Sequence, residues 1–276
     1  MVSNELDLNF TIGSYIQSAA CGEGTRGFAG AGRVRWHGER AVLPRLPPAL
    51  TGAPRYGERV TRAPLSLPGR TVIFDYGEVI SLSPSTADRA VLADLAGVRG
   101  ADAADRFFAA YLAHRDGLDQ GTAGVAAYWR AIAAEIGASW DEARVHQLWA
   151  ADFRSWLSIN PATVEVLTDL RAGGTALALL SNAGPDFGSY FRHGPLGDFF
   201  GAACYVSGEL GLLKPGAGIY RHVLADLGIT PDQAVFIDNR ESNVTGAEAL
   251  GITGHVFTDA DKLRAFLTSL PEPAAG

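Results

Sequence analysis

The stretch Thr71-Val-Ile-Phe-Asp75-Tyr-Gly77-Glu78-Val-Ile-Ser-Leu-Ser-Pro84 does more than any other part of this 276-residue chain to decide its fold class. Its β-branched and aromatic start predicts a short buried strand, which ends on a single carboxylate, Asp75. The following turn contains Gly77, and a glycine lets the backbone approach an anionic ligand or a metal closely. We therefore expect Asp75 to be a nucleophile or a metal ligand.

Three later segments also place polar residues at the end of an apolar run. They are Ala176-Leu-Ala-Leu-Leu-Ser181-Asn182, then Lys214-Pro215, and then Ala234-Val-Phe-Ile-Asp238-Asn239-Arg-Glu-Ser-Asn243. Taken one at a time, each has a plain structural explanation as a helix cap, a solvated loop or an Asx turn. Their occurrence in order at predicted strand ends favours a shared site, because ligands of parallel α/β sheets bind beyond the carboxyl ends of the strands.

In this order the four segments resemble the four motifs of the haloacid dehalogenase (HAD) superfamily of hydrolases, over about residues 70–260. The chain looks most similar to the subfamily IA-like branch, which has a helical C1 cap between motifs one and two. Within that branch it resembles sugar-phosphate-phosphatase-like members whose first motif is Asp-x-Gly-x-Val. The resemblance implies an α/β fold: a doubly wound parallel sheet with a small inserted α-helical cap domain.

The periodicity of the apolar residues supports this division of the chain. Between residues 85 and 157 they recur at helical spacing, which predicts a helical cap. One such helix carries Ala104, Phe107, Phe108, Tyr111 and Leu112. From residue 158 onward, short apolar strands alternate with amphipathic helices, as is typical of a parallel sheet covered on both faces. We assign residues 70–84 and 158–276 to this α/β core.

Residues 1–69 differ from the rest of the chain. They are rich in Gly, Pro and Arg and show no sustained period, which predicts an irregular or disordered N-terminal extension. The segment Gly22-Glu-Gly24-Thr-Arg-Gly27 matches the dinucleotide-binding GxGxxG pattern, but no convincing strand precedes it and no helical pattern follows. A solvated appendage is therefore favoured over a nucleotide site or an Arg-bearing tail for a partner.

Composition bounds the class of protein. The hydrophobic content of 47% is enough for a packed core, and no apolar stretch approaches the ~20 residues that span a bilayer. The two cysteines, Cys21 and Cys204, have no metal-type spacing and fit a reducing compartment. The net charge of −7 argues against a nucleic-acid surface. We expect a cytoplasmic protein without nucleic-acid or membrane partners, and the oligomeric state stays open.

The resemblance implies a role for each motif residue. Asp75 would form an aspartyl-phosphate, and Mg²⁺ would bind Asp75, the backbone carbonyl of Gly77 and Asp238. Ser181 would hydrogen-bond the phosphoryl group of a small phosphorylated substrate. Lys214 would hold that group and Asp75 together by its charge.

Substrate choice is expected to lie beside the motifs and in the cap. Asn182 follows Ser181 and is expected to contact the substrate. In the cap, Arg115 could meet an anion and the ring of Trp129 could face a sugar or another ring. The competing explanation is that aromatic residues at helical spacing pack in a core.

Two positions depart from the commoner pattern of the family. Gly77 stands where many members carry an Asp that acts as general acid and base, which predicts slow turnover. Glu78 is the nearest carboxylate but is expected to point elsewhere from the turn. Asn239 stands where many members carry a second acidic residue, so weaker Mg²⁺ binding is expected.

The leading hypothesis is a Mg²⁺-dependent phosphatase that hydrolyses a small phosphorylated metabolite, with a sugar phosphate as one possibility. The first alternative is a catalytically weak or inactive phosphate-binding or regulatory protein with the same fold. The second is a carbon–halogen hydrolase that attacks with the same Asp75 and leaves Asp238 idle. The physiological substrate stays open.

Overall fold

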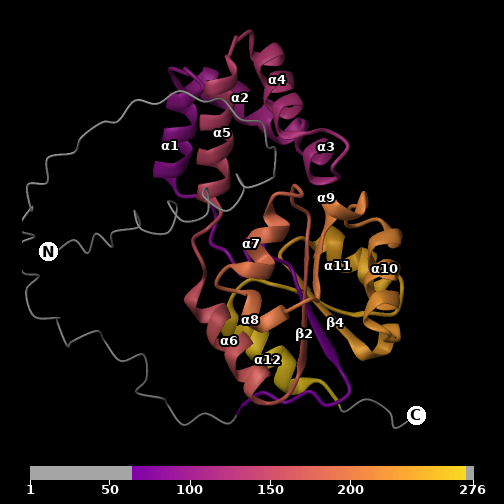
Figure 1. The fold of residues 1–276 in the computed structure, drawn as a ribbon. Helices are drawn as coiled ribbons and strands as arrows, with labels where there is room; N and C mark the ends of the chain where they lie inside the picture. The colour runs from indigo at the N-terminus through magenta and orange to yellow at the C-terminus, as the bar shows by residue number, and fades with distance from the viewer. Residues whose placement is uncertain (1–63, 272–276) are drawn as a thin grey trace, which may run out of the picture. The chain divides into compact units, whose positions relative to one another are not determined.

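The computed structural model describes residues 64–271, and a five-stranded parallel sheet lies at the centre of this part of the chain (Figure 1). The strand order is β3-β2-β1-β4-β5, so β1 is the middle strand. The strands are β1 (Thr71–Phe74), β2 (Ala176–Ser181), β3 (Cys204–Val206), β4 (Ala234–Asp238) and β5 (Thr253–Val256). Phe74 stands in register with Leu179 of β2 and Ile237 of β4. The residue after β1, Asp75, therefore lies at the middle of the carboxyl edge.

Helices cover both faces of the sheet, and this confirms the predicted doubly wound architecture (Figure 1). Val72 and Phe74 pack with one set of helices, and Ile73 packs with the other, because successive side chains of a strand point to opposite faces. The first set is α6 (Pro161–Ala172), α7 (Phe187–His193), α8 (Gly197–Phe200) and α12 (Ala260–Ser269). The second set is α10 (Ala217–Leu227) and α11 (Glu241–Glu248). Two short turns complete the core, α9 (Ser207–Leu210) and the 3₁₀ helix η2 (Pro231–Gln233).

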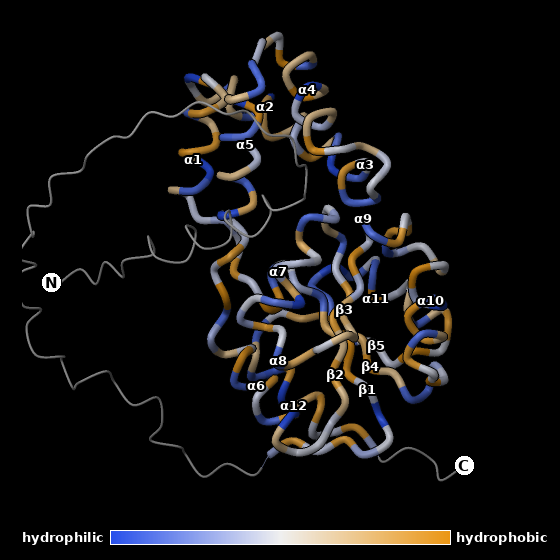
Figure 2. The backbone as a smooth tube through the Cα atoms, viewed as in Figure 1, coloured by the Kyte–Doolittle hydropathy of each residue, from blue (hydrophilic) through white to orange (hydrophobic). Residues whose placement is uncertain are grey.

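The segment between β1 and α6 forms a helical insert with its own apolar core. Its helices are α1 (Thr86–Leu95), α2 (Ala101–Ala113), α3 (Arg115–Asp119), α4 (Val125–Ile136) and α5 (Glu142–Ser155). Phe107, Ile132 and Leu148 are fully buried inside it. Figure 2 shows hydrophobic and hydrophilic residues alternating along these helices, as expected for helices that bury one side. The predicted helical cap is present.

Two connecting segments tie the ends of the insert together. Ser81 and Ile159 form an antiparallel bridge, and the Leu82 amide donates to the Ser158 carbonyl at 2.7 Å. The departing and returning chains thus run side by side at the edge of the sheet where β1 ends. Within residues 64–271, no helix combines the length and the apolar character that a membrane span requires.

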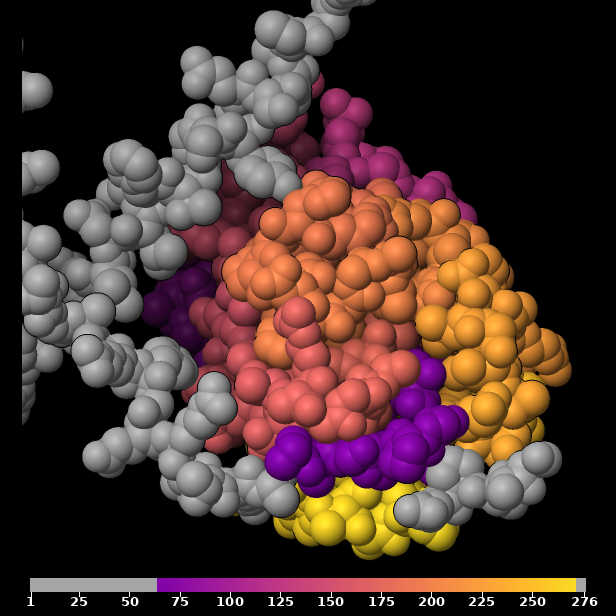
Figure 3. Space-filling view, turned by 60° about the horizontal axis from the view of Figure 1, so that its bottom comes forward, coloured from indigo at the N-terminus to yellow at the C-terminus, as the bar shows by residue number. Residues whose placement is uncertain are grey.

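The core begins earlier than the sequence predicts. Leu67 is buried with an exposure of 8%, its amide donates to Thr175 Oγ1 at 2.9 Å, and Leu65 packs beside it. Figure 3 shows this first described segment, in indigo, lying between the chain around residues 160–180 and the C-terminal helix α12. Residues 64–69 form no helix or strand, as predicted, but the expectation that this segment is an appendage separate from the core is wrong for Leu67. The GxGxxG segment and the other predictions for residues 1–63 lie outside the described residues.

Because Leu67 is buried, Leu67→Ala should lower the free energy of unfolding by about 2–3 kcal/mol. Urea denaturation followed by circular dichroism measures this change. The matched control is Val91→Ala, since Val91 is 40% exposed on α1 and its truncation should change stability by less than about 0.5 kcal/mol. Equal stabilities for the two variants would show that the segment before β1 does not belong to the core.

Candidate active site

Four side chains from three neighbouring strands and one loop meet at the carboxyl edge of the sheet. Asp75 follows β1, Ser181 ends β2 and Asp238 ends β4, which are the middle strand and its two neighbours. Lys214 comes from the loop between α9 and α10, and its Nζ donates to Asp75 Oδ1 and to Asp238 Oδ2, both at 2.7 Å. The structure thus brings the four predicted residues together.

Lys214 is held at its backbone as well as at its ammonium group. The side chain of Asn182 accepts from the Lys214 amide at 3.0 Å and donates to the Lys214 carbonyl at 2.9 Å. The ammonium group makes a third hydrogen bond, to the Leu180 carbonyl at 2.9 Å. Asn182 lines the cavity as predicted, but its amide positions Lys214, which leaves one N–H for a substrate.

Asp238 is fixed by the first turn of α11. Its Oδ1 accepts from the Arg240 amide at 2.8 Å, and its Oδ2 accepts from Asn243 Nδ2 at 3.0 Å. Asp238 has no exposed surface, so both oxygens are held in place with little freedom to rotate. Asn243, the last residue of the fourth motif, thus helps to orient the Asp238 carboxylate.

The buried cluster carries two carboxylates and one ammonium group, which leaves one surplus negative charge. Burial raises the pKa of Asp75 to about 6 from 3.8; the Asp238 carboxylate adds to the rise and the Lys214 ammonium opposes it. A cation beside Asp75 and Asp238 would offset this surplus, and hard oxygen donors suit Mg²⁺. Within residues 64–271, no three His, Cys, Asp or Glu side chains cluster around a common point, so further ligands would be backbone oxygens such as that of Gly77, water or phosphate.

The turn after β1 is arranged differently from the expectation. Glu78 has a φ of 59° and is the only non-glycine residue with positive φ between residues 64 and 271, whereas Gly77 is outside that region. A β-carbon on Gly77 would lie 3.7 Å from the indole of Trp156, an ordinary contact distance. The position of the missing acid is thus open to a side chain, with an aromatic wall beside it.

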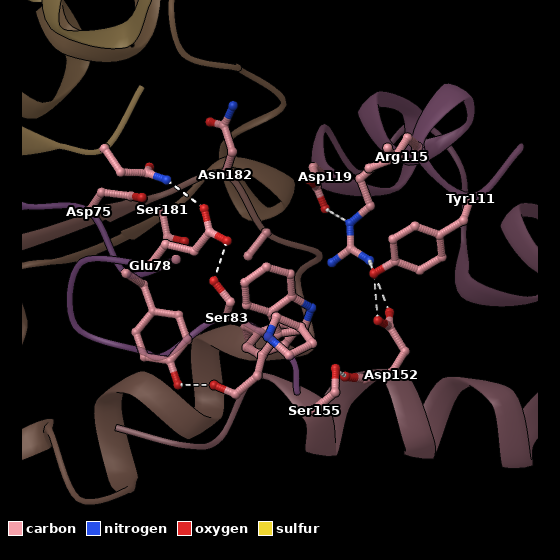
Figure 4. A pocket seen from close by; sticks show the side chains of 18 of the residues that line it. Asp75, Glu78, Ser83, Tyr111, Arg115, Asp119, Asp152, Ser155, Ser181 and Asn182 are labelled. Atoms are coloured by element: carbon pink, nitrogen blue, oxygen red, sulfur yellow. Dashed lines mark hydrogen bonds and ion pairs between the residues drawn. The ribbon is translucent and has the colours of Figure 1, made fainter. Parts of the chain in front are cut away.

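Glu78 lines the cavity, so the expectation that it points elsewhere is wrong. Its carboxylate accepts from Ser83 Oγ at 2.5 Å and from Asn239 Nδ2 at 2.7 Å. Asn239 therefore adds no charge of its own, but it holds a carboxylate at the mouth of the site. Figure 4 shows Glu78 on the same side of the cavity as Asp75 and Ser181.

A cavity of about 480 Å³ connects this edge of the sheet with the insert. That volume is in the range of small-molecule sites. Asp75 and Ser181 line one side, and Arg115 of α3 lines the other (Figure 4). Lys214 lines the cavity beside Asp75, to which its Nζ donates. Trp156 also lines the cavity. The sequence does not predict this position, because Trp156 belongs to none of the four motifs.

Trp129 does not contact the cavity, and the prediction that it binds substrate is corrected. It has no exposed surface and packs against Tyr128, with ring centroids 5.1 Å apart, and against Tyr111 and Trp140. Its helical spacing places it on the inner face of α4, and that inner face meets the core of the insert. The periodicity identifies the buried face but not what the face is buried against.

The chain belongs to the haloacid dehalogenase-like hydrolase family, which it matches over residues 70–251. Among curated proteins, it is 33% identical over 113 residues to a phosphoserine phosphatase of Thermus thermophilus, covering 40% of this chain and 45% of that protein. It is 29% identical over 115 residues to a sesquiterpene phosphatase of Aspergillus oryzae, covering 40% of this chain and 58% of that protein. A drimenol cyclase of Aspergillus calidoustus is 33% identical over 66 residues, 24% of this chain and 12% of that protein. The matches thus span less than two thirds of these relatives.

Solved structures share the fold. A HAD family enzyme of Bacteroides thetaiotaomicron, in complex with magnesium and inorganic phosphate, aligns with a TM-score of 0.56 at 22% identity, covering 70% of this chain and 98% of that chain. L-2-haloacid dehalogenase of Xanthobacter autotrophicus, with chloropropionic acid covalently bound, aligns with a TM-score of 0.51 at 18% identity, covering 72% and 83%. The family match confirms the predicted superfamily, and these alignments confirm the fold class.

Asp75→Asn should stabilise the folded protein at pH 7.5. Because the folded-state pKa of Asp75 is raised to about 6, the folded protein keeps a proton that the unfolded chain releases, and stability falls as the pH rises from about 4 to about 6. Removing the charge should raise the free energy of unfolding by about 1–3 kcal/mol at pH 7.5 and by little at pH 4.

Urea denaturation at both pH values measures the effect, with Asp198→Asn as the control, since Asp198 is exposed on α8. A less stable Asp75→Asn protein at pH 7.5 would mean that attraction to Lys214 outweighs the desolvation of the carboxylate.

Proposed function

We propose that the protein is a Mg²⁺-dependent phosphatase that hydrolyses a small phosphorylated substrate, with Asp75 as the nucleophile. The observation that carries this proposal is the Asp75 carboxylate at the middle of the sheet edge, held by Lys214 Nζ at 2.7 Å and open to the cavity. The phosphatase names of two curated relatives support it, as does the magnesium and phosphate complex of one structural neighbour.

The residues divide the work of phosphoryl transfer. An Asp75 oxygen attacks phosphorus, the bond from phosphorus to the leaving oxygen breaks, and an aspartyl-phosphate forms, while the leaving oxygen takes up a proton from solvent. Water then attacks the phosphorus, gives up a proton to solvent, and releases Asp75 and phosphate. Lys214 keeps Asp75 in place and stabilises charge on the phosphoryl oxygens, and the Ser181 hydroxyl donates to one of them. Mg²⁺ held by Asp75, Asp238 and the Gly77 carbonyl would neutralise the remaining charge.

The two alternatives differ from this proposal in measurable ways. Carbon–halogen hydrolysis would leave Asp238 without a catalytic task, yet Asp238 is completely buried and held by Lys214, Asn243 and a backbone amide. A regulatory protein that only binds phosphate would use the same residues without turnover. Hydrolysis of p-nitrophenyl phosphate with Mg²⁺ and with EDTA, beside chloride release from 2-chloropropionate, separates the three.

The wild-type protein should hydrolyse p-nitrophenyl phosphate with Mg²⁺ and lose that activity with EDTA. Asp75→Asn should lower kcat at least about a thousandfold, because an amide oxygen is a poor nucleophile. Asp198→Asn, exposed and distant in sequence from every motif, should keep the wild-type rate. A folded Asp75→Asn protein with near-wild-type kcat would exclude Asp75 as the nucleophile.

Gly77→Asp should speed the hydrolysis of substrates with poor leaving groups. The φ of Gly77 lies outside the left-handed region, and an added β-carbon meets nothing closer than 3.7 Å, so the variant should fold. A carboxyl group there can protonate the leaving oxygen, an effect typically worth ~10²–10⁴ in rate.

We expect kcat on an alkyl phosphate to rise at least about tenfold and kcat on p-nitrophenyl phosphate to change little, because a nitrophenolate leaves without a proton. Gly77→Ala, which adds the β-carbon alone, is the matched control. No gain on the alkyl phosphate in a folded variant would show that the absence of this carboxyl group does not limit turnover.

A further inference from the structure

The insert contributes a charged network to the cavity opposite Asp75. Arg115 Nε donates to Asp119 Oδ1 at 2.9 Å, and its Nη1 donates to Asp152 Oδ2 at 2.9 Å and to Tyr111 Oη at 2.8 Å. Tyr111 Oη donates in turn to Asp152 Oδ1 at 2.6 Å. The Arg115 side chain is 16% exposed and the two carboxylates less, so the network is a rigid, largely buried unit.

The charges of this network disfavour an anion. The two carboxylates outnumber the one guanidinium group, and a third carboxylate, Asp116, lines the same part of the cavity. In a partly buried site such charges are weakly screened, so a second anionic group of a substrate would meet net repulsion there. The expectation that Arg115 meets an anion is therefore not supported. Nη2 makes none of the three hydrogen bonds above and suits a neutral oxygen acceptor.

Apolar side chains of α1 and α2 form much of the adjoining wall, beside the oppositely charged Asp88 and Arg89 of α1, and the Arg89 guanidinium lies 4.3 Å from the ring centroid of Phe108. Leu92, Phe108 and Leu112 line the cavity, and Trp156 closes it on the side of the sheet. Leu112 has the highest exposure, 66%, among the exposed large hydrophobic residues between residues 64 and 271. The sequence places it on the apolar side of its helix, whereas the structure leaves it at the cavity and out of the insert core. An apolar ligand group would cover it and gain the free energy of burial.

We propose that the substrate of this site is the monophosphate ester of a largely apolar alcohol, without a second anionic group. This inference rests on the proposed function and names its substrate class. The phosphate lies at Asp75 and Lys214, the hydrocarbon part lies against Leu92, Phe108 and Leu112, and any further polar group is a neutral oxygen near Arg115.

A substrate panel tests the proposal on the wild-type protein with Mg²⁺. The panel is hexyl phosphate, glucose 6-phosphate and fructose 1,6-bisphosphate, with p-nitrophenyl phosphate as the general phosphatase reference. Hexyl phosphate should exceed glucose 6-phosphate in kcat/KM by at least about tenfold, and the bisphosphate should be the poorest substrate. Hydrolysis of p-nitrophenyl phosphate combined with a preference for either sugar phosphate overturns this proposal alone. No hydrolysis of any ester overturns the proposed function and this proposal with it.

Two variants test the two walls separately. Leu112→Gln should raise KM for hexyl phosphate about threefold to tenfold more than it raises KM for glucose 6-phosphate, because the hexyl chain loses the apolar contact and the exposed Leu112 has little role in folding. Val91→Gln is the matched control, since Val91 is an exposed apolar residue of the neighbouring helix that does not line the cavity. An unchanged KM for hexyl phosphate in Leu112→Gln would contradict the apolar wall.

Asp119→Asn removes one negative charge and keeps an oxygen that can accept from Arg115. It should raise kcat/KM for fructose 1,6-bisphosphate at least about fivefold relative to hexyl phosphate, since the repulsion of a second anion falls. Asp116→Asn should shift the same ratio in the same direction, and because Asp116 is exposed it controls for damage to the buried network. Unchanged ratios in both variants would show that charge in the insert does not select the substrate.

Discussion

The rest of the site depends on one ammonium group placed between two buried carboxylates. Lys214 Nζ holds Asp75 and Asp238 at 2.7 Å each, and these residues end neighbouring strands of the sheet. Two carboxylates this close and this buried would repel each other strongly without a cation. The position of Lys214 therefore decides whether the carboxyl edge can exist in this form, and Asn182 fixes that position through the Lys214 backbone.

This buried cluster of charges destabilises the folded protein, and the packed core around it compensates for that loss. One negative charge remains uncompensated: burial raises the pKa of Asp75 to about 6, and the neighbouring Asp238 carboxylate adds to that rise. Val72, Phe74, Phe236 and Ile237 are completely buried in the strands that carry the two carboxylates, so the backbone under the site cannot relax to relieve the repulsion. In the proposed function, this surplus negative charge is what Mg²⁺ and the phosphoryl group would offset, so a cluster that is unfavourable in the protein alone would be stabilised by its ligands.

The sequence predicts the core of this protein better than its details. Strand-end carboxylates fall at one sheet edge because all strands are parallel, and that follows from the apolar runs alone. Whether an aromatic residue faces a cavity or a helix core depends on the packing of several helices, so the sequence pattern does not distinguish the buried Trp129 from the cavity-lining Trp156. The direction of Glu78 is not predictable from the sequence either, because its carboxylate is held by Ser83 and by Asn239, which lies 161 positions further along the chain.

The two sides of the cavity carry different kinds of chemistry. On the sheet side, Lys214 and the ends of the strands form the site that we propose for the phosphate group, and the packed core beneath fixes their positions. On the insert side, Arg115 forms ion pairs with Asp119 and Asp152, which neutralise its positive charge within the protein. An arginine indicates an anion-binding site only if no carboxylate of the protein pairs with it. The sequence does not show which carboxylates on other helices will do so. Under the proposed substrate class, the carboxylates around Arg115, more than the arginine itself, decide which groups the insert accepts.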